Sequence, residues 1–268
     1  MRSRDLIADR KGIAEHEAIR LVMAATGRSR TDVLMGFDVT DHEVEWFESY
    51  VQRRLGHEPL QYIEGTVPFG PVVLYVDARV LIPRPETEYM FERLAALADD
   101  PRVIVDLCTG SGNLALALAV TFPKAAVYAV DLSSDATAVA RINAERNGLD
   151  VTVLTGDLFD PLPSNLMGKV DLLVSNPPYL AEEEVERLPP DVLAEPRMAL
   201  VAGARGDEIL KRIASGAGAW LRPDGMVACE ISEFCVERTL GHFAHLDGEV
   251  HADLTETDRF VVGHGTVV

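Results

Sequence analysis

Short apolar segments alternate with helix-like segments from residue 102 onward, and this alternation limits the possible folds more than any other feature of the sequence. Parallel strands that are buried on both faces give continuous apolar runs, and helices connect them. The pattern therefore predicts a seven-stranded, mostly parallel α/β sheet with helices on both faces. The expected strands are residues 102–108, 126–132, 151–159, 170–178 and 226–232, with two more within 250–265 that close one edge, and the expected helices are 114–122, 135–148 and 206–221.

The N-terminal region has a different pattern. Residues 16–26 and 41–55 place apolar side chains three and four positions apart, which is typical of amphipathic helices. Thr40 and Glu43 match the capping box that opens such a helix. In residues 61–82, glycines and prolines separate β-branched runs, which indicates a hairpin. The expected parts are a helical substrate-recognition domain (1–56), a β-hairpin linker (57–80) and a catalytic domain (81–268).

Composition excludes several classes of function. Asp and Glu total 43 against 25 Lys and Arg, a net charge of −18, so a nucleic-acid partner is not expected. The three cysteines include no CxxC pair, and although His242 and His245 have a metal-like spacing, no third ligand is evident and no metal is expected. Without a secretory signal or a membrane-spanning run, the sequence predicts a cytoplasmic protein with no membrane partner and, by default, a monomer.

A glycine-rich turn, Asp106–Gly112 (DLCTGSG), follows the first predicted strand of the sheet. Its glycines let the backbone approach a ligand closely, yet their spacing is tighter than that of dinucleotide-binding loops and no phosphate-binding lysine follows. Asp131 ends the next strand and Asp157 the third. Carboxylates at such strand ends accept hydrogen bonds from ribose hydroxyls. A nucleoside site is favoured over a turn with solvated acids, with Asp157 on the adenine side.

The second motif, Asn176-Pro177-Pro178-Tyr179, ends the fourth predicted strand. A planar NH2 group is a poor nucleophile, and it reacts with an electrophilic methyl group only if it is aligned and its hydrogens are held by acceptors. Asn176 supplies a side-chain oxygen, and the Pro177 carbonyl is fixed in direction by the two consecutive prolines. Tyr179 offers a ring for stacking. Together with the nucleoside site, the motif favours methyl transfer to a planar amino group over a mere strand terminator.

Taken together, these motifs resemble class I amino-group methyltransferases, and the chain more closely resembles the HemK/PrmC-like family of peptide chain release factor N5-glutamine methyltransferases. DNA and RNA amino methyltransferases share Asn-Pro-Pro-Tyr but not the IPRPETE segment, which makes that segment the most discriminating. The matching segments are GHEPLQYIEG (56–65), VLIPRPETE (80–88), DLCTGSG (106–112), VSNPPY (174–179), EPRMAL (195–200) and DLTETDRFVVG (253–263).

The resemblance implies a Rossmann-like sheet, S-adenosylmethionine as the methyl donor, and the glutamine of the Gly-Gly-Gln loop of release factors as the acceptor. The implied catalytic residues are Asn176, Pro177 and Tyr179. The expected cofactor-binding residues are Asp106, Cys108, Thr109, Gly110, Ser111, Gly112, Asp131, Leu132, Asp157, Leu158 and Asn176. The expected substrate-binding residues are Asn176, Pro177, Pro178, Tyr179, Arg84 and Glu195, where Arg84 can pair with Glu86 at the entrance.

The sequence also departs from the family pattern. Cys108 stands where release factor enzymes usually have glycine, and DLCTGSG instead resembles the enzymes that methylate ribosomal protein L3. Residues 201–210 and 230–239 also differ from the usual sequence. Three alternatives therefore stay open: glutamine methylation of L3 or another protein, methylation of adenine or cytosine in nucleic acid, and a non-catalytic cofactor-binding adaptor.

Overall fold

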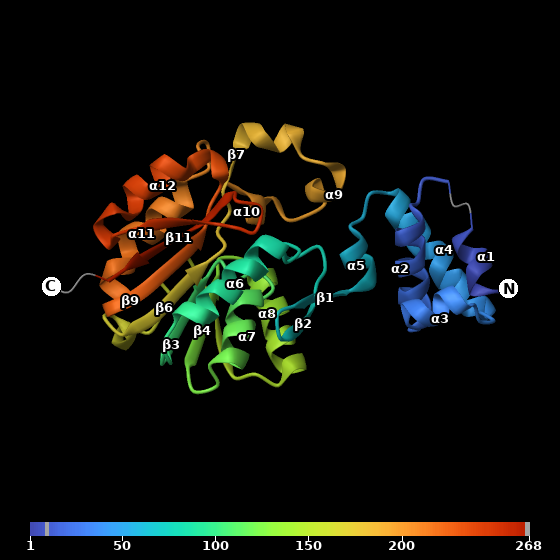
Figure 1. Ribbon diagram of the computed structural model, residues 1–268, viewed down its shortest axis with the longest axis horizontal. Helices are drawn as coiled ribbons and strands as arrows, with labels where there is room; N and C mark the ends of the chain where they lie inside the picture. Colours follow the sequence, from blue (N-terminus) through green and yellow to red (C-terminus); the bar gives the residue numbers. More distant parts are fainter. Residues whose placement is uncertain (9–10, 266–268) are drawn as a thin grey trace. The chain divides into compact units, whose positions relative to one another are not determined.

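The computed structural model describes residues 1–8 and 11–265, and the chain divides into two compact units. Unit 1 comprises Met1–Thr66 and Pro189–Ala194, and unit 2 comprises Val67–Leu188 and Glu195–Val268. Within the described ranges, no helix has the length and apolarity needed to cross a membrane. Figure 1 labels the elements of both units.

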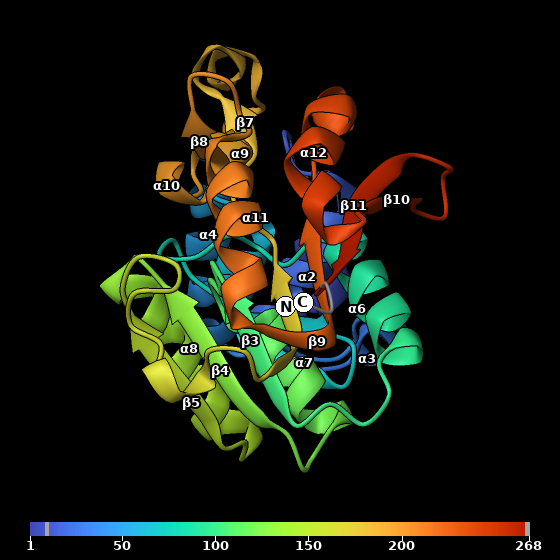
Figure 2. The same cartoon turned by 90° about the vertical axis from the view of Figure 1, so that its left-hand side faces the viewer.

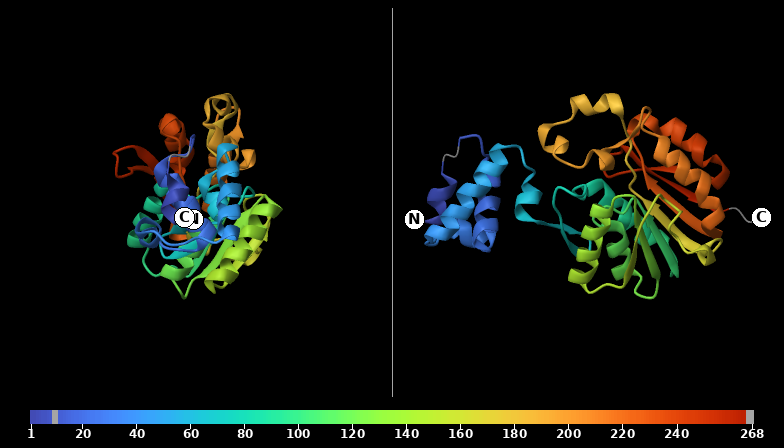
Figure 3. Two further views of the ribbon diagram at one scale, coloured as in Figure 1. Left: turned by 90° about the vertical axis from the view of Figure 1, so that its right-hand side faces the viewer. Right: turned by 180° about the vertical axis from the view of Figure 1, so that it is seen from behind.

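Unit 1 is a small helical bundle (Figures 1 and 3). Leu21 and Phe47, from two of its helices, are fully buried in its core. The predicted capping box is confirmed, because the Thr40 N–H donates to Glu43 Oε2 at 2.7 Å and the Glu43 N–H donates to Thr40 Oγ1 at 3.3 Å. Its helices are α1 (Ser3–Ile7), α2 (Glu15–Thr26), α3 (Arg30–Met35), α4 (Asp41–Leu55), α5 (Leu60–Glu64) and α9 (Pro190–Leu193).

The segment after α4 contains both a helix and a hairpin. Helix α5 follows Pro59 and ends at Gly65, whose φ of 72° is readily adopted by glycine. The hairpin pairs β1 (Thr66–Phe69) with β2 (Val72–Tyr75) in a sheet of its own. The hairpin predicted within residues 61–82 is therefore shorter than expected, since a turn of helix occupies its first residues.

Unit 2 contains the predicted seven-stranded sheet, in the order β10-β11-β9-β6-β3-β4-β5. The strands from β9 to β5 run parallel, and β11 is antiparallel to both β9 and β10. Figure 2 shows β5 and β10 at opposite edges. The strands are β3 (Val103–Leu107), β4 (Ala126–Asp131), β5 (Val151–Thr155), β6 (Val170–Ser175), β9 (Leu221–Glu230), β10 (Glu249–Ala252) and β11 (Asp258–His264).

Helices cover both faces of this sheet (Figures 1 and 2). Because crossover connections are right-handed, helices of the β3-to-β5 half lie on one face and those of the β6-to-β11 half on the other. Val105, Leu173 and Val227 are fully buried between the layers. The first face carries α6 (Pro85–Leu97), α7 (Asn113–Thr121) and α8 (Ser134–Asn147), and the second carries α11 (Glu208–Trp220) and α12 (Val236–Phe243).

A small parallel pair of strands that the sequence pattern did not predict lies beyond the carboxyl end of β6. In this pair, β7 (Leu180–Ala181) lies parallel to β8 (Val201–Gly203). The 3-10 helix η2 (Glu182–Arg187) follows β7, and helix α10 (Arg197–Leu200) precedes β8. This pair brings the EPRMAL segment close to the end of β6, where the Asn-Pro-Pro-Tyr motif begins.

Candidate active site

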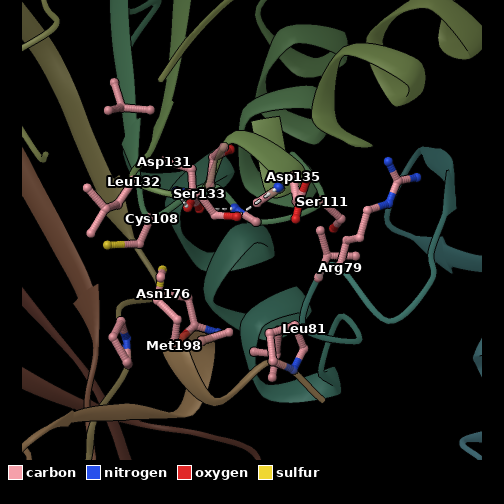
Figure 4. A pocket seen from close by; sticks show the side chains of 18 of the residues that line it. Arg79, Leu81, Cys108, Ser111, Asp131, Leu132, Ser133, Asp135, Asn176 and Met198 are labelled. Atoms are coloured by element: carbon pink, nitrogen blue, oxygen red, sulfur yellow. Dashed lines mark hydrogen bonds between the residues drawn. The ribbon is translucent and has the colours of Figure 1, made fainter. Parts of the chain in front are cut away.

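A cavity of about 530 Å³ opens at the carboxyl ends of β3, β4, β5 and β6 in unit 2. This volume lies within the usual range for small-ligand sites, and its position at the strand ends is where open α/β sheets bind nucleotides. Figure 4 shows Asp131 and Ser133 along one side and Asn176 and Met198 along another. The predicted residues that line it are Arg84, Cys108, Thr109, Gly110, Ser111, Asp131, Leu132, Asp157, Leu158, Asn176 and Pro178.

Asp106 anchors the glycine-rich turn from beneath the cavity. It is 1% exposed, and its Oδ2 accepts hydrogen bonds from the Thr109 hydroxyl at 2.5 Å and from the Ala115 N–H at 3.1 Å. Burial raises the pKa of this carboxyl to about 7, although these two hydrogen bonds oppose the shift. Its Oδ1 is buried without a hydrogen-bond partner among the described residues. Such an orphaned oxygen fits a site that is completed by a polar ligand.

Cys108 adopts a left-handed backbone conformation, with a φ of 58°. Side chains with a Cβ are strained in this region, which explains why glycine is the usual residue at this place in the turn. The Cys108 side chain packs against the hydrophobic core of unit 2 and also lines the cavity. Its bulk therefore narrows the site beside the expected nucleoside.

We predict that the backbone strain at Cys108 can be measured with a pair of variants. Cys108→Gly and Cys108→Ala both remove the sulfur, but only glycine relieves the positive φ. We therefore expect Cys108→Gly to be more stable than Cys108→Ala by about 1 kcal/mol, measured by urea unfolding without ligand. Equal stability, or a more stable alanine variant, would show that the turn relaxes and stores no strain.

Asp131, the last residue of β4, joins the glycine-rich turn to the loop after β4. Its Oδ2 accepts the Gly110 N–H at 2.8 Å and its Oδ1 accepts the Ser133 N–H at 2.9 Å. Burial raises the pKa of the Asp131 carboxyl, and these backbone donors oppose the shift. A carboxylate has about four lone-pair sites, so Asp131 keeps two for further donors such as vicinal ribose hydroxyls.

The strand end after β5 carries Asp157 and Leu158. Asp157 Oδ2 accepts a hydrogen bond from Arg212 Nη2 at 2.8 Å, and both residues line the cavity. Leu158 is 8% exposed and adds an apolar surface that a base can contact. The sequence did not indicate that Arg212, on α11, neutralises this acid.

The motif Asn176-Pro177-Pro178-Tyr179 follows β6 directly. Asn176 lines the cavity, and its Nδ2 donates to the Thr87 hydroxyl at 2.8 Å. The Tyr179 hydroxyl donates to Glu230 Oε1 at 3.4 Å, and burial together with the nearby Glu230 raises the pKa of Tyr179. With Nδ2 engaged, Asn176 Oδ1 is the side-chain atom available to hold an N–H of a substrate.

Arg84 forms an ion pair with Glu195, so its partner is not Glu86 as the sequence suggested. Glu195 is 5% exposed, and its Oε2 also accepts the Ile82 N–H at 2.9 Å. Burial raises the pKa of Glu195, and Arg84 opposes this. This ion pair, in which Glu195 is buried and Arg84 is half-buried, holds the EPRMAL segment against the IPRPETE segment, and both segments line the cavity next to it.

Five predicted site residues contribute without lining the cavity. Asp106 and Glu195 hold the loops as described above, and Gly112 caps α7 with a φ of 85°. Pro177 and Tyr179 lie directly next to the lining residues Asn176 and Pro178. The two histidines with metal-like spacing contact different groups. His242 Nε2 lies 3.1 Å from Asp207 Oδ2, and His245 Nε2 lies 3.1 Å from the Ala214 carbonyl.

More than half of the residues that line the cavity were not predicted individually from the sequence. Some belong to segments that were recognised as motifs without each residue being assigned, and others follow the strand end at Asp131. Ile209 and Arg212 lie on α11, where ordinary helical periodicity gave no functional signal, and the rest, such as Ala78, Asn113 and Gly156, flank the predicted motifs and strand ends. The additional lining residues are Ala78, Arg79, Val80, Leu81, Pro83, Asn113, Val130, Ser133, Asp135, Ala136, Gly156, Pro196, Arg197, Met198, Ala199, Val201, Ile209 and Arg212.

These features fit S-adenosylmethionine. Asp131 has acceptor sites left for ribose hydroxyls, Leu158 offers an apolar face to a base, and Asp106 leaves a buried oxygen without a partner. A Cβ built on Gly110 would meet no described atom within 4 Å, so a ligand can lie against that backbone. An open α/β sheet with this cavity and with Asn-Pro-Pro-Tyr at its edge defines a class I methyltransferase.

Comparisons with known proteins identify the family. Residues 3–65 match the PrmC N-terminal domain and residues 86–205 match the Methyltransferase small domain. The chain is 44% identical to the release factor glutamine methyltransferase of Mycolicibacterium smegmatis, over 85% of this chain and 83% of that protein. It is 42% identical to the ribosomal protein uL3 glutamine methyltransferase of Burkholderia pseudomallei, over 59% of this chain and 54% of that protein.

A solved structure with a similar fold is a methyltransferase from Pyrococcus furiosus. It has a TM-score of 0.54 at 18% identity, and the match covers 73% of this chain and 90% of that one. At this identity the likeness supports the fold alone. The sequence relatives are far closer, and they show that the chain belongs to the release factor glutamine methyltransferase family, whose enzymes depend on S-adenosylmethionine.

Proposed function

We propose that the protein transfers a methyl group from S-adenosylmethionine to the N5 amide nitrogen of a protein glutamine, the glutamine of the Gly-Gly-Gln loop of peptide chain release factors. The observation that carries the proposal is Asn176, which borders a nucleoside-sized cavity with its Oδ1 available. Identities near 40% with release factor glutamine methyltransferases over most of their length support the choice of acceptor.

The residues of the motif act on the nucleophile. An amide nitrogen is a weak nucleophile because its lone pair is delocalised, so the site must align it and hold its hydrogens. Asn176 Oδ1 and the Pro177 carbonyl accept the two N–H groups of the glutamine amide, and they stabilise the positive charge that develops on nitrogen. Tyr179 packs against the planar amide. Bound S-adenosylmethionine supplies an electrophilic methyl sulfonium.

Other residues of unit 2 hold the cofactor and shape the entrance. Asp131 accepts ribose hydroxyls, and the backbone of residues 108–112 lies against the ligand. Leu132, which is 58% exposed, and Leu158 flank the base, with Asp157 on the same side. The Arg84–Glu195 pair fixes the EPRMAL segment at the entrance for the substrate loop. The N-methylated amide cation is strongly acidic, so water can take its proton after transfer.

The direct test is the transfer of labelled methyl from S-adenosylmethionine to purified release factor, with a Gly-Gly-Gln→Gly-Gly-Ala release factor as the matched control. We expect label on the first protein and none on the second, and the modified peptide should contain N5-methylglutamine by mass spectrometry. Equal labelling of both would place the methyl group on another residue. Cofactor binding without any label would direct attention to another protein substrate.

A second candidate substrate is ribosomal protein uL3. It is favoured by Cys108 in the glycine-rich turn and by the uL3 methyltransferase relative, although that relative matches over about half of its length. The same labelling assay with uL3 in place of release factor separates the two. A nucleic-acid substrate is disfavoured by the net charge of −18. We expect a monomeric enzyme that acts without a nucleic-acid or membrane partner.

Unit 1 is proposed to bind the protein substrate away from the reactive loop. The residues that line the cofactor cavity belong to unit 2, so cofactor binding makes no use of the helices of residues 1–56. A chain that lacks residues 1–56 should bind S-adenosylmethionine with unchanged affinity and methylate whole release factor poorly. Unchanged turnover on intact release factor would exclude this role.

A further inference from the structure

Asn176 belongs to a network of hydrogen bonds with Thr87 and Glu230, which are distant in the sequence, and with Tyr179 of its own motif. Asn176 Nδ2 donates to Thr87 Oγ1 at 2.8 Å, and Thr87 Oγ1 donates to Glu230 Oε2 at 2.6 Å. The Tyr179 hydroxyl donates to the other oxygen, Oε1, of Glu230 at 3.4 Å. Thr87 is fully buried and Glu230 is 3% exposed, so water does not substitute for these bonds.

The sheet topology brings these residues together. Strands β6 and β9 are parallel neighbours, and Ser175 lies opposite Cys229, so Asn176, the residue after β6, lies beside Glu230, the last residue of β9. Thr87 lies in the first turn of α6, which begins at Pro85 within the IPRPETE segment. Thr87 is therefore the residue of that segment that contacts Asn176 directly.

The hydrogen-bonding capacity of each group determines which atom donates in each hydrogen bond of this network. An ionised carboxylate only accepts hydrogen bonds, so the single hydroxyl hydrogen of Thr87 must point to Glu230. The lone pairs of Thr87 are then left to face Asn176, and only the NH2 end of an amide can donate to them. The Oδ1 of Asn176 consequently points the opposite way, where it can accept an N–H.

We propose that Thr87 and Glu230 are positioning residues that hold the Asn176 amide with its oxygen directed at the substrate glutamine. This inference rests on the proposed function and deepens it. In the reversed orientation, Asn176 would present N–H groups to the N–H groups of the glutamine and would oppose the developing charge. The pair acts through Asn176 and does not itself touch the reacting atoms.

The ionisation of Glu230 controls which atom donates in each hydrogen bond of the network. Burial raises the pKa of Glu230 to about 7, the hydrogen bond from Thr87 opposes this, and Glu86 raises it further. Tyr179 and Arg259 lower it. A protonated Glu230 can donate to Thr87, which frees the threonine hydrogen and permits the wrong orientation of Asn176. Turnover should therefore rise as Glu230 ionises between about pH 6 and pH 8.

The first test compares Thr87→Val with Thr87→Ser. Valine has the shape of threonine without its hydroxyl, and we expect kcat on release factor to fall by about 10- to 100-fold, a smaller loss than direct removal of a charge-stabilising group. KM and the Kd for S-adenosylmethionine should stay within about threefold of wild type, since the substitution leaves the contacts that bind substrate and cofactor in the ground state unchanged. Serine keeps the hydroxyl and should restore most of kcat.

A matched control is Thr239→Val on α12. Thr239 is also fully buried, and its hydroxyl has no hydrogen-bond partner among the described residues. We expect this variant to keep the wild-type kcat, which separates the loss of the network from the general effect of a buried Thr→Val change. Thermal unfolding of each variant verifies that it is folded.

The second variant, Glu230→Gln, tests the directional argument. Glutamine carries both a donor and an acceptor and has no ionisation near pH 7, so it cannot impose one direction on the hydrogen bonds of the network. We expect a lower kcat and the loss of the rise between about pH 6 and pH 8. A pH profile that matches the wild-type profile would remove Glu230 from the proposal.

A measurement that needs no substrate keeps the inference separate from the proposed function. The Asn176 side-chain NH2 signals in a 15N NMR spectrum, assigned by their absence in Asn176→Asp, should shift with pH near 7 in the wild type. They should not shift in Glu230→Gln. Failure of wild type to label release factor would count against the proposed function alone. Invariant NH2 signals, or a Thr87→Val kcat within threefold of wild type, would overturn the inference.

Discussion

Asn176→Ala should lower kcat for methyl transfer by on the order of 100- to 1,000-fold, the range found when one group that stabilises developing charge is removed. The variant deletes the oxygen that holds the nucleophile and leaves the Pro177 carbonyl as the remaining acceptor. S-adenosylmethionine should still bind, because Asp131 and the glycine-rich turn are unchanged. Single-turnover labelling with saturating cofactor measures the chemical step directly.

A matched control for Asn176→Ala is Asn165→Ala, which removes an exposed asparagine outside the cavity and should retain full activity. Calorimetry with S-adenosylmethionine should give a Kd for Asn176→Ala within about threefold of wild type. Retention of more than a third of wild-type kcat would show that Asn176 does not hold the nucleophile. A non-catalytic adaptor would have no such dependence, so the result also separates these two classes of function.

The sheet was predictable from sequence because its strands are buried on both faces. Such strands give continuous apolar runs, and the helices between them determine parallel pairing and handedness. The register at β6 and β9 places Ser175 opposite Cys229, so these two parallel strands end at the same edge of the sheet. The final pair was also predicted, since β10 and β11 are separated by a short polar turn.

Short elements were not predictable, because local sequence does not determine them. Helix α5 has five residues, too few to show helical periodicity, and its turn residues resemble those of a hairpin. The β7–β8 pair involves segments that meet only when the loops after β6 fold over the cavity, and β7 has two residues. Such short elements are stabilised by tertiary contacts, whereas sequence periodicity indicates only longer, regular helices and strands.

The candidate site likewise contains some residues that the sequence predicted and others that only the fold brings together. Asp131 and Asn176 were predicted because each stands at the carboxyl end of an apolar strand, and the ends of parallel strands meet at one edge. Thr87 and Glu230 were not predicted as site residues, although Thr87 belongs to the IPRPETE segment, because they lie 89 and 54 positions from Asn176 and only the fold brings the three together. Glu195 was recognised as a candidate, but its partner Arg84 is 111 positions away, and only the fold shows that they pair.

Asp131→Ala should weaken S-adenosylmethionine binding by on the order of 100- to 1,000-fold, the second large effect that we expect. Two charge-assisted hydrogen bonds to ribose hydroxyls would be lost, each worth about 1.5–3 kcal/mol, and partial compensation by water reduces the total. The Gly110 and Ser133 N–H groups also lose their acceptor, so the turn against the ligand loosens. Calorimetry of cofactor binding measures the change.

The acidity of Asp131 adds a pH dependence to this binding. Burial raises its pKa in the free protein, so its charged form is partly disfavoured there, and ribose hydroxyls favour that form. Acidification should therefore weaken cofactor binding in the wild type and have less effect in Asp131→Ala. Asp160→Ala, which removes an exposed acid outside the cavity, controls for the change in net charge. A Kd within fivefold of wild type for Asp131→Ala would exclude ribose recognition by this carboxylate, and the cofactor would then have to bind mainly through the backbone of the glycine-rich turn.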